Sequence, residues 1–196
     1  MTDKIIIKNT QYADSRTAPD DLTKDKLYDD TEEHLKDVQK GMDFFAEKLH
    51  EAGLKHDWTK ISYFDQYAED VLSEHTDEDF KKRPWYQKHI YEERHHLNAD
   101  CPLDVTLIDV FEMIADCVMA GKGRFGRVTP EYLNLSDPSI LIRAYFNTVK
   151  LLDDVVEIED INKLNSKTAR ATVDGEKLAY DETQEEWVPE EEYEKE

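Results

Sequence analysis

The 196-residue sequence is strongly acidic, with 46 Asp and Glu against 25 Lys and Arg and a formal net charge of −21 at pH 7. Such a surface repels a nucleic-acid backbone, so we expect no direct binding to duplex nucleic acid. No apolar run approaches the roughly 20 residues of a membrane span, and no signal peptide is recognisable, which predicts a cytoplasmic protein outside the membrane.

Apolar residues recur at helical spacing through most of the chain and predict an all-α protein. Capping and helix-breaking residues flank most of these segments. We expect helices over residues 22–51, 59–74, 84–97, 102–121 and 136–152, with a glycine-rich turn at 121–127 after the fourth.

The ends of the chain differ from this helical pattern. The β-branched run Ile5–Ile7 predicts a short strand, and Asp174-Gly175 predicts the turn of a small hairpin, which we expect to pair with that strand. The acidic run Glu185–Glu196 is expected to be disordered because its charges repel one another. The expected parts are a strand and loop in 1–20, a helical metal-binding domain in 21–160, and a hairpin with an acidic tail in 161–196.

Histidine and aspartate at the first two helices suggest a metal site. His34 lies four residues before Val38, at the edge of the apolar stripe of the first helix. His56-Asp57 starts the second helix, where imidazole and carboxylate together suit a first-row divalent ion. The alternative is that His34 is an ordinary core residue and that Asp57 caps the helix.

Three carboxylates share one stripe of the fourth helix, at Asp109, Glu112 and Asp116. The rest of this helix is apolar almost all round, as in a buried helix. Buried carboxylates repel and lose hydration unless cations compensate them. A metal ion or basic side chains would supply that compensation.

Further candidates flank this helix. His89, His95 and His96 would extend a metal site to two ions or contact a phosphate, or else form an exposed helix face. Lys122 and Arg124 add local positive charge that could bind an anionic ligand, although both could equally be solvated loop residues.

The order His34, His56-Asp57, later aspartate resembles the H…HD…D signature of the HD-type phosphohydrolase superfamily. Locally, His56-Asp57-Trp58-Thr59-Lys60 is similar to the HD-x-S/T-K motif of an uncharacterised phage and bacterial family. The resemblance implies an HD-like helical bundle in which two histidines and two aspartates bind a divalent metal that activates water against a phosphoester. Several HD nucleotidases carry a glutamate where this chain has Lys60.

The leading hypothesis is therefore a metal-dependent phosphohydrolase acting on a nucleotide or related phosphoester, with Mn, Fe, Co, Ni or Zn as cofactor. Metal ligands would come from His34, His56, Asp57 and Asp116, with Asp109 as the alternative fourth ligand and His96 as an extension. Lys60 and Glu112 would be catalytic, and the substrate would contact Lys60, His89, His95, Lys122 and Arg124. The rival hypothesis is a non-enzymatic, phage-type acidic protein that mimics DNA or inhibits a host enzyme; a homodimer stays open in either case.

Overall fold

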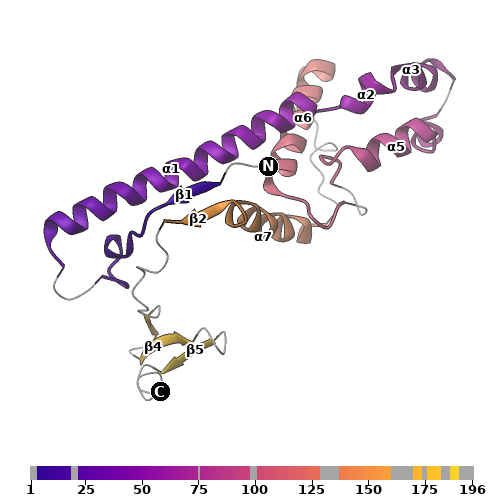
Figure 1. Ribbon diagram of the computed structural model, residues 1–196. Helices are drawn as coiled ribbons and strands as arrows, with labels where there is room; N and C mark the ends of the chain where they lie inside the picture. Colours follow the sequence, from indigo (N-terminus) through magenta and orange to yellow (C-terminus); the bar gives the residue numbers. More distant parts are fainter. Residues whose placement is uncertain are drawn as a thin grey trace. The chain divides into compact units, whose positions relative to one another are not determined.

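The computed structural model describes residues 4–18, 22–74, 76–97, 101–128, 137–159, 170–173, 176–181 and 186–189. Most of these residues are helical, which confirms the all-α class (Figure 1). The chain divides into two compact units, one formed by Met1–Met42 with Val155–Glu196 and the other by Asp43–Asp154. The long helix α1 (Lys24–Lys55) contributes residues to both units.

The first unit contains a parallel pair of short strands. The predicted strand Ile5–Ile7 is β1, and it pairs with β2 (Val156–Ile158), with Ile6 opposite Glu157. A 3-10 helix, η1 (Gln11–Ala13), follows β1, and the backbone N–H of Tyr12 donates to the Asp30 carboxylate of α1 at 3.1 Å. These contacts attach the N-terminal segment to the first part of α1.

The predicted hairpin forms, but with a different partner. Strands β3 (Arg170–Val173) and β4 (Glu176–Asp181) are antiparallel, and β4 pairs on its other side with β5 (Glu186–Pro189). The prediction that the hairpin joins Ile5–Ile7 is wrong, because β1 pairs with β2 in a separate sheet. The expectation that the whole acidic run is disordered is wrong for residues 186–189, which form β5. The Asp174-Gly175 turn, Glu185 and residues 190–196 lie outside the described residues.

The second unit holds the C-terminal part of α1 and the other helices. Their bounds are α2 (Trp58–Ser62), α3 (Phe64–Leu72), α4 (Asp77–Lys81), α5 (Pro84–Glu92), α6 (Leu107–Phe125) and α7 (Ser139–Asp153). The helix predicted over 59–74 is interrupted at Tyr63, whose φ of −118° and ψ of 36° are not helical. The predicted glycine-rich turn is mostly helix, since α6 continues to Phe125 and ends where Gly126 adopts a left-handed φ of 70°.

The core of the second unit lies where α6, α7 and the segment before α6 meet. It consists of Leu97, Cys101, Val105, Val110, Ile140 and Ala144. The backbone N–H of Leu107 donates to the hydroxyl of Thr148 on α7 at 2.7 Å, which fixes the start of α6. The next turns of α6 carry Glu112 and Asp116, so this core positions both carboxylates.

Helix α6 is less buried than its composition predicts. Val110 and Cys117 are buried, but Phe111, Ile114 and Met119 are 55%, 43% and 71% exposed. The expectation of a helix buried almost all round is therefore wrong, since only one side of α6 faces the core. Among the described residues, none of the helices combines the length and the hydropathy needed to cross a membrane.

Candidate metal centre

The turn between α1 and α2 presents His56 and Asp57 to the interior of the second unit. Asp57 has a left-handed backbone, with φ 57° and ψ 25°, a conformation that Asp tolerates better than most side chains. Its carboxylate makes no capping hydrogen bond to α2 and instead contacts the Lys60 ammonium through Oδ2. The helix-cap alternative for Asp57 is therefore not what the structure shows.

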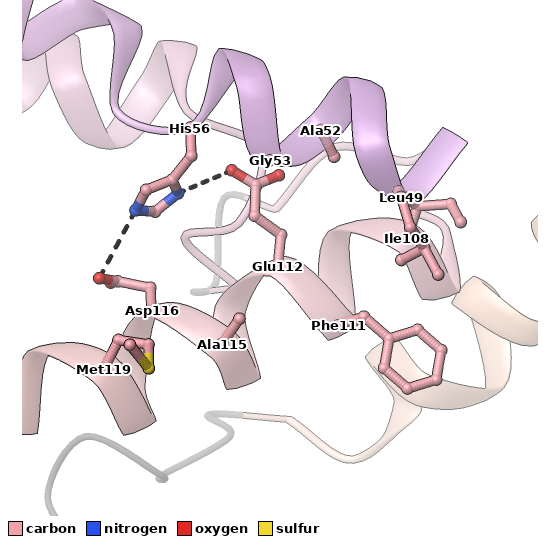
Figure 2. A pocket seen from close by; sticks show the side chains of 10 residues that line it. All are labelled: Leu49, Ala52, Gly53, His56, Ile108, Phe111, Glu112, Ala115, Asp116 and Met119. Atoms are coloured by element: carbon pink, nitrogen blue, oxygen red, sulfur yellow. Dashed lines mark hydrogen bonds and ion pairs between the residues drawn. The ribbon is translucent and has the colours of Figure 1, made fainter. Parts of the chain in front are cut away.

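His56 lies between two carboxylates of α6, as Figure 2 shows. Its Nδ1 is 2.9 Å from Glu112 Oε1, whereas its Nε2 is 3.6 Å from Asp116 Oδ1 and 3.4 Å from Asp57 Oδ2. A carboxylate that binds one ring nitrogen fixes the tautomer and leaves the other nitrogen for a ligand. Glu112 thus directs His56 Nε2 toward the two aspartates.

Glu112 also lies close to a second histidine. His95 is 2% exposed, and its Nδ1 lies 3.1 Å from the same Glu112 Oε1. Its Nε2 lies 3.9 Å from Asp57 Oδ1. His56 and His95 thus both face Glu112 through Nδ1 and Asp57 through Nε2, but only His56 Nδ1 has a hydrogen bond to Glu112.

His89 is oriented by a separate hydrogen-bonded chain. The hydroxyl of Thr59 donates to Glu93 Oε1 at 2.6 Å and lies 2.7 Å from His89 Nδ1. Because a hydroxyl has one hydrogen, His89 Nδ1 must be the donor to Thr59, and its Nε2 carries the lone pair. That Nε2 is 3.6 Å from Asp57 Oδ1.

The Nε2 atoms of His89 and His96 lie 2.9 Å apart. Two nitrogens that each lie about 2.1 Å from one ion, at roughly 90°, would be about 3.0 Å apart. In the structure this distance is a hydrogen bond between the two rings, and it is also compatible with two neighbouring ligands on a single ion.

Three overlapping groups of side chains in this region could hold a metal ion. They are His56, His95 and Glu112; His56, Asp57 and Asp116; and Asp57, His89 and Glu93. In each group the ligand atoms lie within 4.8 Å of one another. Within the described part of the chain, the buried atoms Asp57 Oδ1 and His95 Nε2 have no hydrogen-bond partner. Such orphaned atoms are costly unless a cation or water lies between them, so the donor set fits a divalent ion.

The electrostatics keep two of the histidines neutral. Burial, reinforced by the charge of neighbouring groups, lowers the pKa of His89 to about 3 and that of His96 to about 4. Burial also lowers the pKa of His95, but the Glu112 carboxylate outweighs it and the net pKa is raised. Burial raises the pKa of Asp57, but Lys60 outweighs it and the net pKa is lowered. Neutral imidazoles beside an ionised carboxylate are the protonation states that metal binding needs.

The structure brings together many of the predicted site residues. His56, Asp57, Lys60, His89, His95, His96, Glu112 and Asp116 form the cluster described above. Arg124 lines a cavity together with members of this cluster. Three predicted residues are not part of the cluster. His34 is exposed on the part of α1 that belongs to the first unit, Lys122 is exposed near the end of α6, and Asp109 pairs with Arg94.

Asp109, the alternative ligand, has a structural role. Both carboxylate oxygens accept from Arg94, at 2.8 and 3.1 Å, and the backbone N–H and hydroxyl of Thr106 donate to Oδ2. Asp109 is 5% exposed, so this network compensates a buried charge at the start of α6. The sequence analysis expected either a metal ion or basic side chains to compensate the acidic stripe. At Asp109 the compensating group is the basic side chain of Arg94.

Two residues of the site were missed by the sequence analysis, Thr59 and Glu93. Helical spacing would place Glu92, three residues after His89, on the same helix face as that histidine. However, α5 ends at Glu92, and the extended backbone of Glu93 turns its carboxylate toward Thr59. The only available signal was the position of Glu93 between His89 and His95-His96.

Comparison with known proteins yields no match to this chain among protein-family models, curated proteins or solved structures.

Proposed function

We propose that this protein is a divalent-metal-dependent phosphohydrolase of the HD type, acting on a nucleotide or related phosphoester. The supporting observation is the convergence of His56, His89 and His95 on Asp57, each with Nδ1 facing a carboxylate or hydroxyl and Nε2 toward the Asp57 carboxylate. Carboxylates behind histidines are the usual outer partners of metal ligands. The H…HD…D resemblance agrees with this arrangement at His56, Asp57 and Asp116.

We assign the metal to His56, Asp57 and Asp116, with His89, His95 and His96 able to complete its coordination. Mixed imidazole and carboxylate donors suit Mn, Fe, Co, Ni or Zn better than Mg or Ca. When bound, such an ion would lower the pKa of a water and polarise a phosphoryl oxygen.

The chain's own residues would bind and orient the phosphoester. Lys60, in contact with Asp57, and Arg124 both line a cavity beside the cluster, where their charges would neutralise phosphate oxygens. Glu112 is a positioning residue in this proposal, since its Oε1 already faces the Nδ1 atoms of His56 and His95.

The first test is metal content, measured by elemental analysis of protein purified without affinity tag or chelator. We expect near-stoichiometric transition metal in the native chain and its loss in Asp57→Ala. The metal that is found then selects the ion for a screen of phosphoester hydrolysis, with Asp57→Ala as the inactive control. We expect the native protein to release phosphate and Asp57→Ala to release none.

The opposite outcome favours the acidic interaction protein. If neither protein holds metal after incubation with manganese, iron, nickel and zinc, the phosphohydrolase proposal is wrong. The net charge of −21 would then favour a protein that acts through its acidic surface.

A further inference from the structure

A cavity of about 430 Å³ lies between the last turns of α1 and helix α6 (Figure 2). Its lining residues come from positions 49–53 of α1, from His56 and from positions 108–119 of α6, all in the second unit. It is separate from the cavity that Lys60 and Arg124 line, although Asp116 forms part of both walls. Its volume lies within the roughly 300–1,000 Å³ of small-molecule sites.

Most of the wall of this cavity is apolar and accessible. The residues that give it this character are Leu49, Ala52, Ile108, Phe111, Ala115 and Met119. Leu49, Phe111 and Met119 are 39%, 55% and 71% exposed, so a ligand can reach them in the folded chain. Small residues keep the space free, and a Cβ added at Gly53 would meet no atom within 4 Å. Covering such a surface removes apolar area from water and therefore favours binding.

The polar part of the wall belongs to the candidate metal centre. It consists of His56, Glu112 and Asp116, which between them occur in two of the three groups that could hold an ion. Figure 2 shows His56 and Asp116 on one side of Glu112 and the side chains of Ile108 and Phe111 on the other. A molecule in this cavity would therefore have one end at the metal centre and the other end against apolar side chains.

The chemistry of the two ends selects the ligand. Glu112 and Asp116 are carboxylates, so an anionic group can bind beside them only when a metal ion offsets their charge. At the apolar end, the described lining residues offer no polar side chain to a bound group. The ring nitrogens of a base or the hydroxyls of a sugar would lose hydrogen bonds to water there, which is costly. A saturated hydrocarbon group has no such atoms and fits this end without that cost.

We propose that this cavity binds the hydrocarbon group of a phosphoester whose phosphate lies at the metal centre. The proposal rests on the proposed phosphohydrolase function and narrows its substrate class to phosphoesters of aliphatic alcohols, in preference to nucleotides. Asp116 lines both cavities. A phosphate bound beside it would therefore have access to Lys60 and Arg124 in one cavity and leave its ester group to the other.

Binding to the full chain tests this proposal without requiring turnover. Isothermal titration of the manganese-loaded protein would compare inorganic phosphate, butyl phosphate, hexyl phosphate and adenosine 5′-monophosphate, all below the concentrations at which micelles form. Each methylene added between butyl and hexyl phosphate should tighten binding by about two- to fourfold. Hexyl phosphate should also bind more tightly than adenosine 5′-monophosphate. In chelator-treated protein the carboxylates should repel the phosphate and weaken the binding of hexyl phosphate at least about tenfold.

Two substitutions that fill the cavity test its position. Ala115→Leu should abolish the preference for hexyl over butyl phosphate and leave the affinity for inorganic phosphate unchanged. Gly53→Leu should do the same from the α1 side, where the open space around the added Cβ makes the change compatible with the fold. Ala46→Leu, at an exposed position of α1 outside the cavity, is the matched control and should keep the preference of the native chain.

The outcomes separate this proposal from the proposed function. If metal binds and phosphate is released, but butyl and hexyl phosphate bind equally or the nucleotide binds more tightly, the hydrocarbon site is wrong and the phosphohydrolase stands. If neither metal binding nor phosphate release is found, but hexyl phosphate binds more tightly than butyl phosphate and Ala115→Leu removes the difference, the phosphohydrolase is wrong and the hydrocarbon site stands. If chain length has no effect and Ala115→Leu converts a dimer into a monomer in light scattering, the apolar wall is an interface between two copies and the proposal is wrong.

Discussion

Asp57 Oδ1 lies 3.9 Å from His95 Nε2, and neither atom has a hydrogen-bond partner among the described residues. Both groups are held in place from behind, Asp57 by the turn after α1 and His95 by its buried position beside Glu112. Two buried, facing, unpaired ligand atoms cost free energy in the absence of a cation. This relationship supports a metal position on the Asp57 side of the histidines.

Metal content should distinguish Asp116 from His34. Asp116→Ala removes a carboxylate 3.6 Å from His56 Nε2 and should release most of the metal. His34→Ala changes an exposed side chain outside the three candidate groups, so the metal should be retained. Elemental analysis of both variants checks this. Metal lost from His34→Ala would instead support the role that the H…HD…D resemblance gives to His34.

Glu112→Gln should weaken metal binding without removing a direct ligand. A neutral amide holds the Nδ1 atoms of His56 and His95 less strongly, and loss of such outer partners typically costs about 10- to 100-fold in affinity. Competition with a chromophoric chelator measures the change. Glu69→Gln, on the exposed face of α3, is the control. Equal affinities for the two variants would show that Glu112 does not position the histidines.

Most of the longer helices could be predicted from the sequence because they depend on local apolar spacing, as in α7. The break at Tyr63 and the short helix α4 were not predicted. The pairing of His56 and Asp57 was also visible, since adjacent residues in a turn stay close in any fold. The role of Glu93 could not be predicted. It depends on the end of α5 at Glu92, the residue before Glu93, and on the hydroxyl of Thr59 in α2. Asp109 and Glu112 lie on the same stripe of one helix, so the sequence could not separate their roles. The difference comes from Arg94, 15 residues away, which pairs with Asp109.

Asp109 should matter for stability and not for metal binding. Asp109→Ala leaves Arg94 without its main partner and removes two hydrogen bonds to Thr106, so the free energy of unfolding should fall by about 2 kcal/mol. Urea denaturation measures the loss, and elemental analysis should show unchanged metal content. Asp104→Ala is the matched control, because Asp104 also contacts Arg94 but its side chain is 78% exposed. If Asp109→Ala instead loses its metal and keeps the native free energy of unfolding, Asp109 is a metal ligand and not a structural residue.

The metal-free protein should be most stable near pH 6.5. In the folded chain the pKa values of His89 and His96 are depressed to about 3 and about 4, so the unfolded chain binds more protons as the pH falls below 6.5. Stability should then decrease toward pH 4, by at most about 1.4 kcal/mol per pH unit for each histidine. His95 acts in the opposite direction, because its raised pKa stabilises the fold below 6.5 and this contribution is lost as the pH rises through the folded value.

Urea denaturation of chelator-treated protein at pH 4.5, 5.5, 6.5 and 8 would measure this profile. The His34→Ala variant, which changes an exposed side chain outside the histidine cluster, should follow the native curve. Stability that stays constant from pH 6.5 to 4.5 would mean that His89 and His96 accept protons freely in the folded chain. His89 Nε2 would then lie in water rather than beside Asp57, and the metal assignment would lose the neutral imidazoles on which it depends.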